Sequence, residues 1–373
     1  MSTNPLKSLN RFGQSVWYDN IHRTMLRTGE LARLVADDGV SGVTSNPTIF
    51  EKAITGSDAY DDAIAEAVRS NPDWDAAELF NHLAVEDIRA AADVLRPVYD
   101  TSNGQDGMVS IEVSPTLAHD AAGTVAEARK LHAWIDRPNV MIKVPATREG
   151  VAAIETLIAD GINVNVTLLF AVARYAEVAE AYIKGLEQRL AAGKPVDRVA
   201  SVASFFVSRV DTAVDRLLES RPEGEALLGK TAIANARAAY AKFLEIFDGA
   251  RFAKLKEAGA QVQRLLWAST GTKNPSYSDV LYVEELIAER TVNTMPPATF
   301  EAYRDHGQPA ARLLPALAEA PRTLQQVAAL GIDLDAITEQ LEREGVEAFI
   351  ASYRNLLQAL TAKMAALKQQ AEA

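Results

Sequence analysis

Short runs of β-forming residues alternate along the chain with longer segments of helical pattern, and this alternation constrains the fold more than any other feature. Strands that alternate with helices are typical of a parallel sheet, because each return crossover has room for a helix. Eight runs are found, with the weakest patterns in the first and the last: residues 15–19, 40–44, 108–113, 140–144, 162–167, 199–206, 264–269 and 291–294. We therefore expect an α/β fold built on parallel strands.

The segments between these runs carry apolar residues at three- and four-residue spacing, for example over residues 26–35, where Gly39 is expected to cap the helix. Segments 47–107 and 211–259 are too long for one crossover helix each, so extra helices are expected in both. From Leu334 to the end the pattern is helical, and we expect this helix to pack over the strands. Its apolar stripe consists of Phe349, Tyr353, Leu356, Leu357 and Leu360.

Length and composition describe an ordinary globular chain. With 373 residues it could form one large domain or two smaller ones. No internal repeat, low-complexity block or linker-like run marks a boundary, so a single domain over residues 1–373 is the simpler interpretation. Hydrophobic residues make up 48% and charged residues 24%, which disfavours disordered and membrane classes.

Charge and residue usage exclude several kinds of function. The formal net charge of -12 argues against nucleic acid and anionic membranes as partners. The absence of cysteine excludes disulfides, thiolate catalysis and cysteine metal sites, and the five histidines show no ligand spacing, so we expect no metal. The first residues, Met1 to Pro5, lack a signal-peptide pattern. We expect a cytoplasmic enzyme that acts on a small molecule.

Parity within the predicted strands separates polar from aliphatic faces, because successive side chains point to opposite sides of a strand. In the fourth strand the aliphatic residues share one face and leave Lys143 on the other. In the third strand Glu112 likewise lies opposite the aliphatic face. In the fifth strand the polar face carries Asn163, Asn165 and Thr167. One face of several strands is therefore polar, and it includes a lysine and a carboxylate.

These polar residues favour a (β/α)8 TIM barrel, in which catalytic groups gather where the strands end at one mouth. A sheet with one solvated face would instead carry mostly Lys, Glu, Arg and Thr on its polar side. Parity is least clean in the sixth strand, where Ser201 and Ser204 fall on opposite faces. The residues expected to converge are Asp19, Asn46, Glu112, Lys143, Asn165, Thr167, Ser204 and Ser269.

A lysine inside a barrel suits Schiff-base chemistry, because desolvation disfavours the ammonium form and a neutral amine attacks carbonyl groups. Formation and hydrolysis of the carbinolamine require proton transfer, for which Glu112 and Asp19 are candidates. Thr167 could hold the water that relays the proton. The catalytic set is thus Lys143 with Glu112, Asp19 and Thr167, and it uses no cofactor.

A second set of residues suits substrate binding. Neutral side chains of Asn46, Asn165 and Ser204 can bind sugar hydroxyls. After the sixth strand comes Arg209, and the seventh is followed by a small-residue loop from Ser269 to Lys273, which offers backbone amides and a cation to a phosphate group. The loop lacks the spacing of a Walker motif, so it is a weak signal when taken alone.

Each of these residues also has an ordinary structural explanation. A lone lysine in an apolar strand is more often a solubility device of an edge strand, and a lone Glu112 is about as well explained by a structural ion pair. Asp19, Asn46 and Ser204 could be turn or cap residues, whereas Asn165 and Thr167 could terminate a strand ladder. Arg209 alone could be a surface or ion-pairing residue. The shared face of these residues favours the functional interpretation, because otherwise several independent structural explanations would have to apply to residues on the same face of several strands.

The motifs around these residues resemble transaldolase, in composition and in order along the chain. The resemblance runs from about Trp17 to the C-terminal helix and rests on Val43–Pro47, Ser110–Val113, Ile142–Thr147, Gly161–Phe170 and Ala203–Arg209. It implies that Lys143 forms the Schiff base with the donor ketose, and that Thr167 holds the relay water. It also implies transfer of a dihydroxyacetone unit from sedoheptulose 7-phosphate to glyceraldehyde 3-phosphate in the pentose phosphate pathway, with no cofactor or metal.

The resemblance is to the longer branch of the family, and we expect the form without the glucose-6-phosphate isomerase that is fused to some members. Shorter members carry an arginine in the loop after the seventh strand, where this chain offers Lys273. We expect a monomer or homodimer. A class I aldolase that releases the three-carbon unit to water is the nearest alternative, and a non-catalytic sugar-phosphate-binding barrel is another, although the latter would not need Lys143.

Overall fold

The computed structural model describes residues 4–372, and its centre is a closed barrel of eight parallel strands. Residues 1–3, part of the N-terminal segment considered above, lie outside the described residues. The strands follow one another around the barrel in chain order, and the last pairs with the first. They are β1 (Gln14–Tyr18), β2 (Val40–Val43), β3 (Met108–Glu112), β4 (Val140–Pro145), β5 (Val164–Leu169), β6 (Ser201–Phe206), β7 (Arg264–Ala268) and β8 (Thr291–Met295).

Helices surround the barrel, and the extra helices predicted in the two long segments are confirmed as α4 to α6 and α10 to α12. The α-helices are α1 (Pro5–Leu9), α2 (Arg23–Arg27), α3 (Glu30–Arg33), α4 (Pro47–Thr55), α5 (Asp61–Ser70), α6 (Ala76–Thr101), α7 (Ala121–Ile135), α8 (Arg148–Asp160), α9 (Val172–Ala191), α10 (Ser208–Leu218), α11 (Thr231–Phe247), α12 (Ala250–Glu257), α13 (Leu281–Glu285), α14 (Pro297–His306), α15 (Ala320–Ala329) and α16 (Leu334–Glu372). The short 3-10 and π turns are η1 (Asn10–Phe12), η2 (Leu34–Asp38), η3 (Pro115–Leu117), η4 (Pro222–Leu227) and η5 (Leu317–Glu319). Within residues 4–372 no helix is both long and apolar enough to cross a membrane.

Two strands start later than the sequence pattern predicted. Ile162 lies in the turn that ends α8, because its backbone N–H donates to the carbonyl oxygen of Leu157 after Gly161 takes the left-handed conformation, with φ of 90°. Similarly, Val199 closes a turn by bonding to Val196. Both residues are apolar and buried, so their hydrophobic pattern extends the strands in sequence although the backbone has not yet joined the sheet.

The first predicted helical segment is broken into pieces. Gly29 has φ of 71° and separates α2 from α3, which then runs into the π turn η2. Gly39, with φ of 75°, caps this turn as predicted. A left-handed residue cannot continue a right-handed helix, so the apolar spacing across Gly29 comes from two helices that contact the same core.

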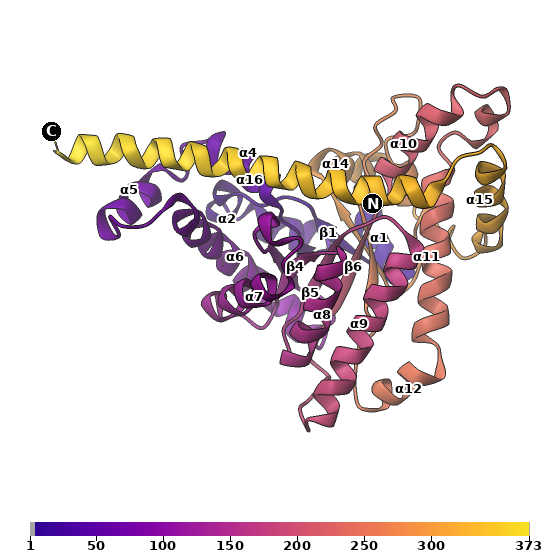
Figure 1. Ribbon diagram of the computed structural model, residues 1–373, viewed down its shortest axis with the longest axis horizontal. Helices are drawn as coiled ribbons and strands as arrows, with labels where there is room; N and C mark the ends of the chain where they lie inside the picture. The colour runs from indigo at the N-terminus through magenta and orange to yellow at the C-terminus, as the bar shows by residue number, and fades with distance from the viewer. Residues whose placement is uncertain (1–3, 373) are drawn as a thin grey trace.

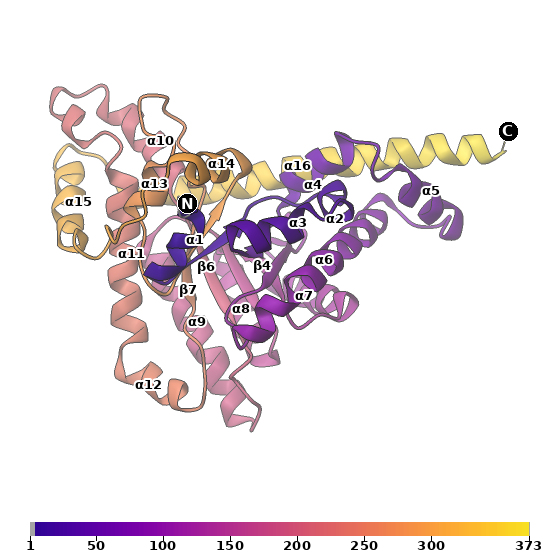
Figure 2. The same cartoon turned by 180° about the vertical axis from the view of Figure 1, so that it is seen from behind.

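The C-terminal helix α16 crosses the mouth at which the strands end, as predicted. In Figures 1 and 2 it runs as a long rod along one edge of the molecule, whereas α12 lies at the opposite edge. It contacts α4, α6, α10 and the end of β5. At Gly345 a Cβ atom would lie 2.8 Å from Leu168, so the helix backbone rests almost directly on the end of β5.

At the opposite mouth, polar side chains that include Ser15, Asp106 and Arg264 line a cavity of about 790 Å³. The Trp17 indole occupies the space above Gly42, where a Cβ atom would lie only 2.4 Å from the ring. The indole N–H donates to the Oδ1 atom of Asp106 over 2.7 Å, and the Arg264 guanidinium lies 6.0 Å from the indole ring. None of the predicted catalytic or binding residues lines the cavity at this end, which agrees with the general placement of active sites at the other mouth of such barrels.

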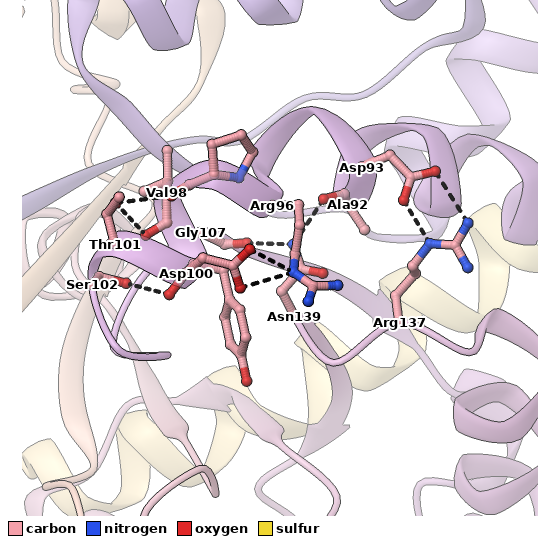
Figure 3. A network of polar contacts seen from close by, with 12 residues as sticks. Ala92, Asp93, Arg96, Val98, Asp100, Thr101, Ser102, Gly107, Arg137 and Asn139 are labelled. Carbon is pink, nitrogen blue, oxygen red and sulfur yellow. Dashed lines mark hydrogen bonds and ion pairs between the residues drawn. The ribbon is translucent and has the colours of Figure 1, made fainter.

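Strand β4, which carries Lys143, is anchored at its amino end by Asn139 (Figure 3). The fully buried amide of Asn139 donates to the carbonyl oxygens of Ala92 and Gly107, each over 2.8 Å. Beside it, Arg137 forms an ion pair with the exposed Asp93 at 2.6 Å. One side chain therefore ties the start of β4 to α6 and to the residue before β3.

We predict that Asn139→Asp destabilises the protein by about 3 kcal/mol or more, because a buried carboxylate would face two carbonyl oxygens that have lost their donor. The free energy of unfolding from urea denaturation measures the effect. Asp93→Asn is the matched control, since it weakens only the exposed ion pair and should cost less than about 1 kcal/mol. Equal costs for the two variants would show that Asn139 does not anchor β4.

Candidate active site

The register of three neighbouring strands places the predicted reactive groups on one level. In the pairing of β3 with β4, Glu112 lies beside Lys143, and in the pairing of β4 with β5, Lys143 lies beside Asn165. In parallel strands, residues paired in register point to the same face. The side chains of Lys143 and Glu112 are 5% and 4% exposed, so both point into the protein as parity predicted.

The amine of Lys143 is held by one carbonyl and one carboxylate. Its Nζ atom donates to the carbonyl oxygen of Ser45 over 3.0 Å and lies 3.6 Å from Oε2 of Glu112. The Ser45 hydroxyl donates to the carbonyl oxygen of Ser110 on β3, which fixes the acceptor in place. The nitrogen therefore has a fixed position next to a group that can exchange a proton with it.

Burial changes the protonation of the two carboxyl groups around the amine. Desolvation raises the pKa of Glu112 to about 7, although the neighbouring Lys143 lowers it and Asp19 raises it further. Desolvation likewise raises the pKa of Asp19, against the effects of Lys143 and a 2.6 Å hydrogen bond from Thr44. A carboxyl group with a pKa near neutrality can donate and accept protons at physiological pH, which suits acid–base catalysis.

Thr167 lies at the end of β5 with its hydroxyl directed into the site. The side chain is fully buried, lines the cavity and has no hydrogen-bond partner for Oγ1 among residues 4–372. The next residue, Leu168, has φ of 59°, a left-handed conformation that is strained for leucine, and the pairing register with β6 shifts there. The strand therefore twists just where it presents the unpaired hydroxyl.

Asn165 and Ser204 form a hydrogen-bonded chain beneath the amine. Ser204 donates to Oδ1 of Asn165 over 2.7 Å, and Nδ2 of Asn165 donates to Ser110 over 2.9 Å. Ser204 lines the cavity, which resolves the parity of β6, since Ser201 bonds instead to the backbone of Val164. In this structure Asn165 is a fully buried support, and its contact with substrate stays a prediction.

Asn46 has two roles in the geometry. Its Oδ1 atom accepts a hydrogen bond from the N–H of Ile49 over 2.9 Å and caps α4, so Asn46 is the cap residue that the alternative explanation from sequence proposed. The same side chain lines the cavity that contains Lys143. Capping orients the amide so that it stands in the cavity wall.

The cavity of about 170 Å³ extends from Lys143 toward a basic end. This end is lined by Arg209 at the start of α10 and by Ser269, Gly271 and Lys273 in the loop after β7. Burial lowers the pKa of Arg209, whose guanidinium lies 5.4 Å from the Phe206 ring, whereas Lys273 is exposed. Ser269 has φ of 56° and shares a 2.8 Å hydrogen bond with Ser208. The structure thus brings all the predicted binding residues except Asn165 to the cavity wall.

Several residues of the cavity wall were not predicted, among them Phe349 and Thr44. Phe349 of α16 lies with its ring 5.8 Å from Nζ of Lys143 and forms part of the cavity wall. Its apolar stripe was recognised, but nothing in the sequence indicates that it faces the lysine. Thr44 bonds to Asp19 and to Thr294 of β8, over 2.6 and 2.7 Å, and it lies within a motif that was recognised as a whole.

Among residues 4–372 no group of three or more His, Asp or Glu side chains is arranged to hold a metal ion. The groups that line the cavity are an amine, the Asp19 carboxyl group, hydroxyls and an amide, with two cations at one end. The Glu112 carboxyl group is not part of the cavity wall but lies 3.6 Å from the amine. An amine of this kind forms imines with carbonyl compounds, and the cations bind anions.

Comparison with known proteins gives a consistent result. The family model described as Transaldolase/Fructose-6-phosphate aldolase matches residues 16–360. A protein named transaldolase from Thiobacillus denitrificans is 50% identical over 356 residues, which cover 95% of this chain and 99% of the relative. One from Acidothermus cellulolyticus is 52% identical over 363 residues, with 96% of both chains covered. "Transaldolase 2" from Nostoc sp. is 45% identical over 378 residues, with 98% of both covered.

The raised pKa of Glu112 predicts a specific dependence of stability on pH. Because the pKa is about 7 in the folded protein and about 4.3 in an unfolded chain, folding favours the protonated form. This contribution is complete below about pH 4.3 and is lost as the pH rises through about 7. Glutamine resembles the protonated acid, so the free energy of unfolding of the wild type should fall relative to Glu112→Gln across this range.

Urea denaturation at several pH values measures the difference between the two proteins. Glu66→Gln, at an exposed position of α5, is the control and should give a curve parallel to the wild type. A Glu112→Gln curve that is also parallel to the wild type would contradict the raised pKa.

Proposed function

We propose that this chain, which belongs to the transaldolase/fructose-6-phosphate aldolase family, catalyses the transaldolase reaction through a Schiff base on Lys143. Transaldolase activity follows from the family match and from relatives about half identical over almost the whole chain. The reaction transfers a dihydroxyacetone unit from sedoheptulose 7-phosphate to glyceraldehyde 3-phosphate, and it gives erythrose 4-phosphate and fructose 6-phosphate in the pentose phosphate pathway. The proposal concerns the residues that perform it.

The observation that carries the mechanism is the buried amine of Lys143, 3.6 Å from a carboxyl group whose pKa is about 7. Transfer of a proton from Nζ to Glu112 leaves a neutral amine, which attacks the C2 carbonyl of the donor ketose. In the resulting carbinolamine the C2 oxygen takes one proton from the nitrogen and a second from Glu112, so that it departs as water and leaves the iminium. The unpaired Thr167 hydroxyl lines the same cavity and supports a role in holding the water that relays this proton.

Cleavage requires a base at a different point of the substrate. Asp19 lines the cavity itself and approaches from β1, so it suits removal of the C4 hydroxyl proton. The C3–C4 electron pair then passes into the iminium, the aldose leaves and an enamine remains on Lys143. Attack of the enamine on the acceptor aldehyde, with return of the proton by Asp19, forms the new ketose, which water releases from the lysine.

Binding roles follow from position in the cavity. Asn46 and Ser204 lie in its wall and are suited to sugar hydroxyls, and Asn165 is assigned to the same group through its contact with Ser204. Arg209 is suited to the substrate phosphate, together with Ser269 and Lys273 of the loop after β7.

The substrates are phosphorylated sugars, and the chemistry described uses only protein side chains, without metal or cofactor. The net charge of -12 supports a protein that binds neither nucleic acid nor anionic membranes. We also assign a single domain over residues 1–373, a cytoplasmic location and a monomeric or homodimeric state.

The Schiff base is tested by borohydride reduction in the presence of fructose 6-phosphate, followed by peptide mass mapping. We expect one adduct of a reduced three-carbon or six-carbon unit on the peptide that contains Lys143. Lys143→Arg should abolish the adduct and lower kcat by at least about 1,000-fold, because a guanidinium is not a nucleophile at neutral pH. An adduct on another lysine, or one that persists in Lys143→Arg, would end this mechanism. A complete lack of adduct would favour a binding protein.

The family description includes an aldolase, so transfer must be distinguished from release. A transferase turns over fructose 6-phosphate only after an aldose such as erythrose 4-phosphate is added, whereas a lyase releases free dihydroxyacetone from fructose 6-phosphate alone. We expect dependence on the acceptor. Sustained release of dihydroxyacetone without acceptor would assign the chain to the aldolase activity.

Arg209 and Lys273 should contribute unequally to phosphate binding. Arg209→Ala should raise the KM for fructose 6-phosphate about 10- to 100-fold, because it removes a partly buried cation with several donors. Lys273→Ala should raise it about 5- to 10-fold, since this side chain is exposed and screened by solvent. Steady-state kinetics with fructose, which lacks the phosphate, is the control and should be little affected by either variant.

A further inference from the structure

The loop from Ser269 to Val280 presents Lys273 to the cavity but has almost no regular structure of its own. It follows β7 and precedes α13, and several of its residues, including Lys273, are exposed. A lysine on a free loop loses considerable conformational entropy when it is ordered around a phosphate group. Something outside the loop must therefore define its position if Lys273 is to contribute to binding.

Helix α10 forms hydrogen bonds at three points, two with this loop and one with helix α13 that follows it. At its first residue, Ser208 donates its N–H to the carbonyl oxygen of Ser269 over 3.1 Å. One turn later, Asp211 accepts a 2.8 Å hydrogen bond from the Tyr282 hydroxyl. Another turn on, Asp215 accepts one of 2.8 Å from the Tyr277 hydroxyl. Residues four apart share one face of a helix, so both carboxylates face the same segment.

Both carboxylates also have a second contact, with the start of α11 or the turn before it. The other oxygen of Asp211 accepts from the N–H of Ala232 over 2.6 Å, and that of Asp215 accepts from the N–H of Gly229 over 3.2 Å. Gly229 has φ of 70°, and a Cβ atom there would lie 2.9 Å from the Tyr277 ring. The missing side chain at Gly229 therefore leaves the space that the Tyr277 ring occupies.

Burial of the Asp211 and Asp215 carboxyl groups costs desolvation free energy, and packing of the loop by itself would not require buried carboxyl groups. Desolvation raises the pKa of Asp211 to about 7 and raises that of Asp215, although each receives hydrogen bonds. Buried charged groups can often be replaced by apolar residues without loss of stability. Neither carboxylate lines the cavity, and the groups to which they are hydrogen-bonded do not line it either, so neither is placed to act on the reacting atoms.

The helix that holds the loop also carries the other cation of the basic end. Arg209 is the second residue of α10, directly after the Ser208 contact and two residues before Asp211. On the loop, Asn274 follows Lys273, and its carbonyl accepts the N–H of Tyr277 over 3.1 Å. A short turn therefore connects Lys273 to the tyrosine that Asp215 holds.

We propose that Asp215 and Tyr277, supported by Asp211 and Tyr282, are positioning residues that hold Lys273 opposite Arg209 at the phosphate end of the cavity. These four residues form the loop clamp. The inference rests on the proposed function for its substrate, a phosphorylated sugar, and extends it by assigning residues outside the cavity to phosphate affinity.

The clamp is tested with Tyr277→Phe, which removes one hydroxyl and keeps the ring packed against Gly229. We expect the KM for fructose 6-phosphate to rise about 3- to 10-fold with kcat within about twofold of the wild type, and no change with fructose. Tyr175→Phe is the matched control, because that buried tyrosine has no partner for its hydroxyl among residues 4–372. It should leave both KM values unchanged.

A double-mutant cycle identifies the path of the effect. If Tyr277 acts through Lys273, then Tyr277→Phe should add nothing to the KM of Lys273→Ala, since the residue being positioned is already gone. Independent, multiplying effects of the two substitutions would overturn the proposal. It would also be overturned if Tyr277→Phe had no effect, or an equal effect with fructose and fructose 6-phosphate.

A binding measurement separates this inference from the catalytic one. Calorimetry with inorganic phosphate should give a Kd that is higher in Tyr277→Phe than in the wild type and unchanged in Tyr175→Phe. If the wild type fails to form an adduct on Lys143 but the phosphate Kd still rises in Tyr277→Phe, the proposed reaction fails and the clamp stands. If the adduct forms but the phosphate Kd is the same in both proteins, the clamp fails and the reaction stands.

Discussion

The contact between the Lys143 amine and the Glu112 carboxyl group is the interaction on which the rest of the site depends. A buried ammonium or carboxylate alone would be strongly destabilising, and each lowers the desolvation cost of the other. The pair exists because the register of β3 and β4 makes Glu112 and Lys143 neighbours across the ladder. Closure of the barrel fixes that register, since a slip of one residue in either strand would turn the side chain of that strand outward. Chemistry and barrel closure thus depend on the same backbone hydrogen bonds.

Some polar side chains in the interior of the barrel have hydrogen-bond partners within the protein, and others have none. Asn165 is bonded through its amide to Ser204 and Ser110, and Thr44 joins Asp19 to β8. In contrast, Thr167 Oγ1 and Glu112 Oε2 have no hydrogen-bond partner among residues 4–372. Buried polar groups normally find partners, so exceptions call for a functional explanation. Other buried atoms among residues 4–372, such as Tyr175 Oη and Asn293 Nδ2, also lack a partner, but these two belong to the groups proposed to exchange protons and water with the substrate.

The sequence was sufficient to predict the barrel and its reactive level, because both are encoded by local alternation within strands. Parity alone placed Lys143 and Glu112 together, and register confirmed it. The same local pattern failed at Ile162 and Val199, which are apolar and buried but belong to turns. Phe349 could not be placed beside Lys143, because its position depends on how α16 lies across the mouth, a contact between segments some 200 residues apart.

The two ends of the cavity therefore differ in how they are built. Groups that perform the chemistry lie on or directly after strands, where the ladder holds them without further support. The cations at the far end lie on a helix start and on a loop, so their spacing has to be set by contacts outside the barrel. Asp211 and Asp215 provide such contacts, yet neither shows a motif in sequence, because an acidic residue on a helix usually faces water. Their function becomes visible only when the tyrosines they hold, separated from them by more than 60 residues, are found bonded to them.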